Sequence, residues 1–270
     1  MSNKFRLLTL YSGSSGNSVF VSSGNTNILI DAGKSAKSLC NALKQIGSDI
    51  KEIDAIFITH EHSDHISALE VICKSNDIPV HITNTSAKKF DRTPDSFVHR
   101  RMVRHDPIYT ETVGDITVTS FRTPHDSMMS VGYRIEFISD GEKHVFGVAT
   151  DIGYISESIK EGLVGCEAVV LEANHDLQML DDGPYPYNLK LRIKSNKGHL
   201  SNLDSACFAA YLAQNGTKRF LLAHLSAENN QPELAFDEAH CSISDPSVCI
   251  YIASPDAPTE IFFDTSEVMV

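Results

Sequence analysis

Residues 60–65 read HEHSDH and place three histidines and an aspartate within six positions. They follow the apolar run 55–59, which predicts a buried strand. Because side chains two positions apart in an extended chain point the same way, His60 and His62 could hold one metal ion from one side. Imidazoles and carboxylates are the ligands that Zn²⁺ and related divalent ions prefer. We therefore expect a metal site here rather than a polar loop in which Asp64 only caps a helix.

The elements that must position these residues alternate between strands and helices. Short apolar runs predict strands over 7–11, 19–22, 27–31, 55–59, 116–121, 133–138, 144–150, 168–172 and 220–223. Apolar residues at helical spacing predict helices over 36–46, 65–76 and 202–214. This order favours sheets covered by helices, and the lack of repeats or low-complexity linkers favours a single domain over 1–270.

The composition is that of a globular protein with an acidic balance. The 270 residues include 35 acidic and 23 basic side chains, which gives a formal net charge of −12. Such a charge argues against an unspecialised nucleic-acid binder, although a local basic patch would escape this argument. No apolar run approaches the length of a membrane span, and the first ten residues lack the apolar core of a signal peptide. The six cysteines show no C-x-x-C spacing, which favours free thiols and a cytoplasmic location.

The motif H-x-H-x-D-H at 60–65 is the signature of the metallo-β-lactamase superfamily, which the chain resembles over nearly its whole length. Its other motifs are matched, in order, by Asp31, His125, Asp151 and His224. A narrower resemblance, to the YycJ/WalJ group, is carried by SGSSGN at 12–17, EANHD at 172–176, GPYP at 183–186 and GHLSN at 198–202. That group is described as metal-dependent nucleases with 5′→3′ exonuclease activity on DNA.

The resemblance implies an α/β fold, a four-layer αβ/βα sandwich with two divalent metal ions at one edge of its sheets. It implies one metal bound by His60, His62 and His125, and another bound by Asp64, His65 and His224. Asp151 would lie between the metals, because a carboxylate has two oxygens whereas a neutral imidazole cannot bridge. Asp31 would accept a ring N–H from a ligand histidine, although a turn cap before Gly33 is the alternative. Histidine ligands suit Zn²⁺, and the aspartate oxygens admit Mn²⁺ or Fe.

The implied chemistry is hydrolysis by a hydroxide that bridges the two metals. Metal binding lowers the pKa of water from 15.7 to about 7 in the best-known zinc case. Asp64 would orient this water or accept its proton. Glu172 and His199 resemble a pair that handles proton transfer and phosphate contact in the tRNase Z branch. His175 could contact the substrate, and a packing or capping role is an equal alternative for it.

A basic stretch lies between the two members of that Glu–His pair. Residues 183–203 contain no acidic residue and carry four positive charges, at Lys190, Arg192, Lys194 and Lys197. Phosphate affinity comes from such residues, so we expect Lys190, Arg192 and Lys194 to bind a nucleic-acid backbone. Tyr185 could stack on a base. The alternative is a solvated face.

Three functions compete at this level. A binuclear metal-dependent phosphodiesterase that degrades nucleic acid, with DNA as the favoured polymer and a 5′→3′ exonuclease as the favoured type, fits the resemblance. A small-molecule hydrolase of the same fold, acting on a cyclic phosphodiester, thioester or lactone, would use the same metals. A metal-stabilised regulatory scaffold would need no catalysis. The sequence leaves open the physiological metal, DNA against RNA, the polarity of cleavage and the oligomeric state.

Overall fold

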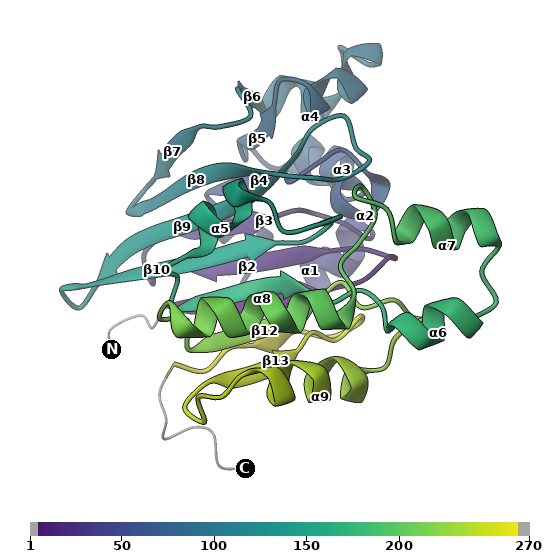
Figure 1. Ribbon diagram of the computed structural model, residues 1–270. Helices are drawn as coiled ribbons and strands as arrows, with labels where there is room; N and C mark the ends of the chain where they lie inside the picture. The colour runs from purple at the N-terminus through teal and green to yellow at the C-terminus, as the bar shows by residue number, and fades with distance from the viewer. Residues whose placement is uncertain (1–4, 264–270) are drawn as a thin grey trace.

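The computed structural model describes residues 5–263, and their strands form two seven-stranded sheets (Figure 1). The first sheet has the order β14-β1-β2-β3-β4-β5-β6 and consists of β14 (Thr259–Glu260), β1 (Arg6–Tyr11), β2 (Ser18–Ser22), β3 (Asn27–Ile30), β4 (Ala55–Phe57), β5 (Val80–Thr83) and β6 (Met102–His105). The second has the order β13-β12-β11-β10-β9-β8-β7 and consists of β13 (Cys249–Ile252), β12 (Arg219–Ala223), β11 (Ala168–Glu172), β10 (Glu142–Ala149), β9 (Ser130–Ser139), β8 (Ile116–Thr123) and β7 (Thr110–Val113).

Helices cover the outer face of each sheet. The described helices are α1 (Ala36–Gln45), α2 (Ser63–Ile66), α3 (Leu69–Ser75), α4 (Phe97–Arg101), α5 (Glu157–Leu163), α6 (Leu177–Asp182), α7 (Tyr187–Ile193), α8 (Asn202–Gln214) and α9 (Pro232–Ser242), with 3₁₀ turns at Ile50–Glu52 and Ser86–Arg92. Apolar residues of α1 and α3 pack on the first sheet, and those of α5, α8 and α9 pack on the second. In Figure 1 the two groups of helices lie on opposite sides of the paired sheets. The expected four-layer αβ/βα sandwich is confirmed.

Strands β1 to β5 of the first sheet are buried on both faces, and their sequence explains this. In β1, Leu7 joins the core between the sheets, whereas Leu8 and Leu10 join the core under the helices. In β3, Ile28 lies in the core between the sheets and Leu29 in the core under the helices. Alternation of two apolar faces gives the continuous apolar runs from which these strands are predicted.

Two predicted elements around the histidine motif are shorter than expected. The strand predicted over 55–59 ends at Phe57, because the Thr59 N–H donates to the Asp31 carboxylate at 2.8 Å instead of extending the ladder. The helix predicted over 65–76 is split into α2 and α3. The Ala68 N–H donates to the Ala32 carbonyl at 2.9 Å, which takes it out of the helical hydrogen-bond series. The motif is therefore held by neighbouring loops rather than by one continuous helix.

The topology gathers polar residues at one edge of the sandwich. Strands β3, β4 and β5 are parallel, as are β10, β11, β12 and β13. Parallel strands end at the same edge of a sheet, where ligands bind in open α/β folds. The residues that follow or end these strands include Asp31, His60, Asp151, Glu172 and His224.

Helices α6 and α7 form an excursion between β11 and α8, and Figure 1 shows them projecting beyond the end of the sheets. None of the helices in the described part of the chain is long and apolar enough to cross a membrane. All six cysteines are free thiols.

Candidate metal centre

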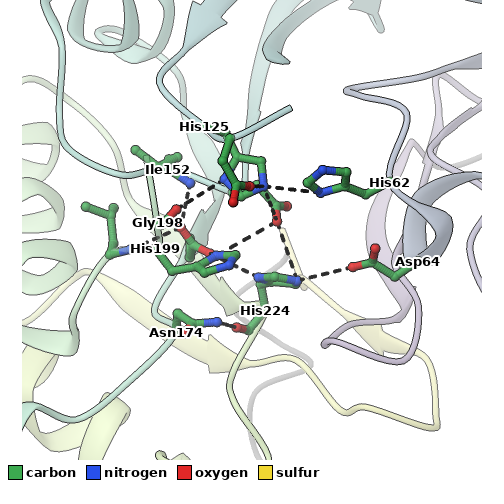
Figure 2. Close-up of polar contacts among 12 residues, drawn as sticks. His62, Asp64, His125, Ile152, Asn174, Gly198, His199 and His224 are labelled. Carbon is green, nitrogen blue, oxygen red and sulfur yellow. Dashed lines mark hydrogen bonds and ion pairs between the residues drawn. The ribbon is translucent and has the colours of Figure 1, made fainter. Parts of the chain in front are cut away.

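The structure brings all seven predicted metal ligands together, and Figure 2 shows several of them converging. They form overlapping groups whose potential ligand atoms lie within 4.8 Å of one another. One group contains His60, His62 and His125; a second contains Asp64, His65 and His224; a third joins His60 and His65 to Asp151. The two metal-binding sets that the resemblance implies are thus each assembled in space.

Asp151 lies between the two sets. Its Oδ1 is 3.7 Å from the Nε2 of His125 and 3.7 Å from the Nε2 of His224. Its Oδ2 is 3.3 Å from the Nε2 of His65. One carboxylate therefore contacts histidines of both sets, which is the position that a bridging ligand requires.

Three buried atoms of this cluster have no hydrogen-bond partner: His60 Nε2, His224 Nε2 and Asp151 Oδ2. The 3.3 Å approach of His65 to that oxygen is an ion-pair distance without hydrogen-bond geometry. A buried polar atom without a partner costs about 1–3 kcal/mol. Two imidazole nitrogens and a carboxylate oxygen are donors that divalent metals prefer, so the unpartnered atoms fit a bound cation.

The charges in the cluster also favour a cation. Burial lowers the pKa of His60 well below its usual value, so its imidazole is neutral, as metal binding requires. Burial also opposes protonation of His224, but Asp151, Asp64 and Glu172 together outweigh it and raise the pKa of His224 to about 10. The pKa of His65 is raised in the same way, by Asp151 and Asp31. The buried carboxylates thus favour positive charge nearby, and a bound metal ion would supply that charge in place of protons.

Asp31 holds one of the predicted ligands in place. Its Oδ2 lies 2.7 Å from the Nδ1 of His65 and accepts a hydrogen bond from the Thr59 hydroxyl at 2.8 Å. Thr59 Oγ1 is also 3.0 Å from the Nδ1 of His60. A carboxylate on Nδ1 fixes the ring and leaves Nε2 to face a metal. Thr59 is part of this support, and no motif or pattern in the sequence predicts this role.

The glycine- and serine-rich loop 12–17 supports the second metal set, Asp64, His65 and His224, from another direction. The Ser12 hydroxyl accepts a hydrogen bond from the His224 N–H at 2.8 Å. The Asn17 N–H donates to the Asp64 carbonyl at 2.8 Å, and its Nδ2 lies 3.2 Å from the Nε2 of His65. These hydrogen bonds give Ser12 and Asn17 a positioning role that composition alone did not predict.

Glu172 is buried and fully hydrogen-bonded. Its Oε1 lies 2.7 Å from the Nδ1 of His199 and 3.0 Å from the Nδ1 of His224. Its Oε2 accepts hydrogen bonds from the Ile152 and Leu200 N–H groups at 2.7 and 3.2 Å. Burial opposes ionisation, but His199 and His224 together outweigh it and lower the pKa of Glu172 to about 2. The predicted Glu–His pair is thus formed, with the carboxylate as an acceptor that is out of reach of solvent.

Backbone strain is concentrated at the strand ends that carry the site. Asp31, Asp151 and His224 have φ values of 64°, 60° and 58°. This left-handed region costs L-residues roughly 1–2 kcal/mol, and such strain clusters where function requires a particular geometry. Asn174 stabilises one of these residues, because its Nδ2 donates to the His224 carbonyl at 2.8 Å (Figure 2).

The predicted basic strip lies on α7 and at its C-terminal end, where two aspartates contact three of its basic side chains. Arg192 Nε is 2.5 Å from Asp126 Oδ2. Lys190 donates to the Asp181 carbonyl at 2.7 Å, and Lys194 pairs with the Asp181 carboxylate. Asp181 lies outside the acid-free stretch, so the sequence did not predict this neutralisation.

The structure places His175 in the interior. His175 is only 2% exposed, and its Nδ1 has no hydrogen-bond partner. Burial lowers its pKa to about 4. A substrate in solution cannot reach this ring without a rearrangement, so the geometry favours the packing alternative.

Comparison with known proteins agrees with this geometry. Residues 26–225 match the family model of the β-lactamase superfamily domain. The chain is 36% identical over 226 residues to exodeoxyribonuclease YycJ of Bacillus anthracis, with 84% of each chain covered. It is 35% identical over 235 residues to exodeoxyribonuclease WalJ of Streptococcus pneumoniae, covering 86% of this chain and 85% of that one.

Solved structures agree at the level of the fold. The metallo-β-lactamase fold protein YhfI from Bacillus subtilis superposes with a TM-score of 0.73 at 18% identity, covering 95% of this chain and 99% of that chain. The same two-sheet arrangement therefore persists where most residues differ.

Proposed function

The chain belongs to the metallo-β-lactamase superfamily, and from this premise we propose that it is a metal-dependent nuclease that degrades DNA from an end. The observation that carries the hydrolytic part is the placement of Asp151 between two histidine sets that leave buried atoms unpartnered. The names of the relatives, which align over 84–86% of this chain, support DNA as the substrate.

The metal ligands that we propose are those that the structure brings together. One ion would be held by His60, His62 and His125, another by Asp64, His65 and His224, with Asp151 between them. Bound Zn²⁺ or Mn²⁺ would lower the pKa of a water and stabilise negative charge on the phosphoryl oxygens. The choice of Zn²⁺ or Mn²⁺, the use of two ions and the 5′→3′ direction are parts of this proposal.

Asp64 and His199 are the residues that we propose to act on the reacting atoms. The Asp64 side chain is 22% exposed, so its carboxylate can orient an attacking water and accept a proton from it. The His199 side chain is 19% exposed, and its Nδ1 is held by Glu172. This leaves the other ring nitrogen of His199 to donate a proton to the leaving oxygen. Glu172 is then a positioning residue for His199 and His224.

We also propose that residues 1–270 form one domain and that the chain acts in the cytoplasm. One apolar core joins β1, β2 and β3 to β8, β9 and β10, so the two sheets share a single interior. The free thiols are compatible with a reducing compartment.

The test is cleavage of end-labelled single- and double-stranded DNA and RNA by protein reconstituted separately with Zn²⁺ and Mn²⁺. We expect stepwise shortening of DNA from its 5′ end, abolished in Asp64→Ala and His65→Ala. Lack of mutant-sensitive cleavage of any polymer, with metal demonstrably bound, would overturn the proposal. It would then favour the small-molecule hydrolase.

A further inference from the structure

A cavity of about 160 Å³ adjoins the candidate metal centre. His199, Gly198 and Asn174 line it on the side of the site, and all three appear in the close-up of Figure 2. Tyr185 and Leu189 line it on the side of α7. Since His199 belongs to both the cavity and the Glu172 contact, a molecule in this cavity lies next to the group proposed to protonate a leaving oxygen.

The wall that α7 provides is fixed in place. The His199 N–H donates to the Ile193 carbonyl at 3.0 Å, and Arg192 pairs with Asp126. A Cβ on Gly198 would lie 2.0 Å from the Ile193 carbonyl oxygen, so the chain approaches the end of α7 as closely as glycine allows. The cavity is therefore built into the fold rather than left between loosely placed side chains.

The size of the cavity suits one flat ring system. A protein cavity of about 150 Å³ binds benzene, and this one measures about 160 Å³. Two stacked rings would need more room. The lining has the same two-sided character as a nucleobase, which has apolar faces and polar edges. Tyr185, Leu189 and Ile193 can contact a face, while Ser14, Asn174 and Ser226 supply polar groups for an edge.

We propose that this cavity holds the terminal nucleobase of the nucleic-acid strand, so that the enzyme removes one nucleotide at each step. The inference rests on the proposed nuclease function. With the terminal base beside His199, the phosphodiester that joins it to the next nucleotide is the bond nearest the metal centre. In the hydrolysis the oxygen of one water bonds to phosphorus, the P–O bond to the leaving oxygen breaks, and a proton goes to that oxygen. The product is a mononucleotide.

The test compares two substitutions on α7. Leu189→Trp would fill the cavity, whereas Leu191→Trp changes the same residue type on the same helix at a position that is 49% exposed and outside the lining. Each protein is assayed on an oligonucleotide with an ordinary terminal base and on one with an abasic terminal nucleotide. Hydrolysis of bis(p-nitrophenyl) phosphate, which needs no base pocket, reports on the metal centre.

We expect the wild type to prefer the base-bearing end by about tenfold or more in kcat/KM, a factor typical of one base stacked in a site. Leu189→Trp should remove this preference through KM, and Leu191→Trp should keep it. Both should still hydrolyse the small diester. Tyr185→Ala, which opens the cavity instead of filling it, should weaken the preference and serves if the tryptophan variant does not fold.

Two results would overturn the inference, and they differ from each other. If the wild type degrades DNA with equal kcat/KM for the base-bearing and the abasic terminus, or releases mainly longer fragments, the base pocket is wrong and the nuclease proposal stands. If the wild type hydrolyses the small diester but no DNA, the nuclease proposal fails and the pocket falls with it.

Discussion

Two regions of the molecule concentrate histidines, and they differ in the neighbours that surround each ring. At the metal centre, histidines contact carboxylates: Asp31 and Asp151 for His65, and Glu172 for His224. On β5 and β6, His81 and His105 are stacked with aromatic rings instead. His81 lies over Phe57 with ring centroids 4.5 Å apart, and His105 lies over Tyr109 at 3.9 Å.

The difference appears in the pKa values. Burial opposes protonation in both regions. At the metal centre the carboxylates outweigh it for His65 and His224 and raise the pKa of His224 to about 10, whereas burial prevails at His60 and lowers its pKa. In the aromatic stack, burial and the neighbouring His105 together lower the pKa of His81 to about 4. Burial alone therefore does not identify a ligand histidine, because the carboxylates determine which sign of charge the region attracts.

The aromatic stack also contains potential metal ligands, but they satisfy each other. His81, His105 and Glu111 have ligand atoms within 4.8 Å of one another. However, His81 Nδ1 and His105 Nε2 are 3.0 Å apart and share a hydrogen bond. Neither ring contributes to the buried unpartnered atoms of residues 5–263, whereas His60 and His224 both do. We therefore interpret the pair as a packing element, and the comparison can be tested from both sides.

The largest effect should follow from Asp151→Ala. This change removes the one carboxylate that contacts both histidine sets, so we expect metal content to fall and activity to drop by more than about 10³-fold, beyond the 10²–10³ typical of one lost electrostatic contact. Metal analysis and DNA cleavage measure these losses. Asp140→Ala is the matched control, because Asp140 also has a left-handed φ, of 51°, but is exposed on a hairpin turn. Equal losses in both variants would show that backbone strain alone explains the result.

A smaller effect should follow from Glu172→Gln. Both carboxylate oxygens of Glu172 only accept hydrogen bonds, and glutamine replaces one of them with an NH₂ donor. This NH₂ group must face other donors, either the two histidine rings or the Ile152 and Leu200 N–H groups. We expect kcat to fall by about 10²-fold, the lower end of the range for one electrostatic contact, with little change in KM. Steady-state kinetics on DNA would separate the two. A change confined to KM would contradict the positioning role.

Asp31→Asn should have a weaker effect again. Asparagine keeps the size and tolerates the φ of 64°, but it retains only one acceptor oxygen for Thr59 and His65. Loss of such supporting contacts typically lowers metal affinity or activity about 10- to 100-fold. Competition with a chelator would measure the affinity. Asp115→Asn alters a carboxylate that binds Ser23 and Asn25 at the start of β8, the opposite end of that strand from His125, and should leave the metal affinity unchanged.

The sequence predicted the parts of this site that depend on residue type and strand ends. The motif at 60–65 follows a continuous apolar run, so a polar cluster at the edge of a sheet could be inferred from it alone. The roles of Asp31 and Glu172 were first suggested by family resemblance, and the structure adds their contacts.

The rest depends on contacts between segments that are distant in the chain. The split between α2 and α3 arises because Ala68 donates to Ala32, and no local pattern contains that information. Similarly, the charge of Lys194 is matched by Asp181, which lies just outside the acid-free stretch. The backbone of His224, with its left-handed φ, is held by hydrogen bonds from distant segments, because Ser12 accepts from its N–H and Asn174 donates to its carbonyl.

The smallest effect on activity, and the clearest contrast with Asp151, should come from His81→Phe. Phenylalanine keeps the stack on Phe57 and removes the titrating ring. We expect metal content and DNA cleavage at pH 7 to remain within about twofold of wild type, in line with a core substitution of similar size. A loss of metal in this variant would break the distinction between the two histidine regions.

The same variant should change how stability depends on pH. In the unfolded chain His81 titrates near 6.5, and in the fold its pKa is about 4, so the unfolded state binds more protons between these values. The wild type therefore keeps the full contribution of this residue above pH 6.5 and loses it as the pH falls towards 4. At about 1.4 kcal/mol per pKa unit, the fall from 6.5 to about 4 corresponds to a loss of about 3 kcal/mol. Urea unfolding at pH 7 and pH 4.5 should show a flatter pH dependence in His81→Phe, and parallel curves would mean that His81 has the same pKa in the fold as in the unfolded chain.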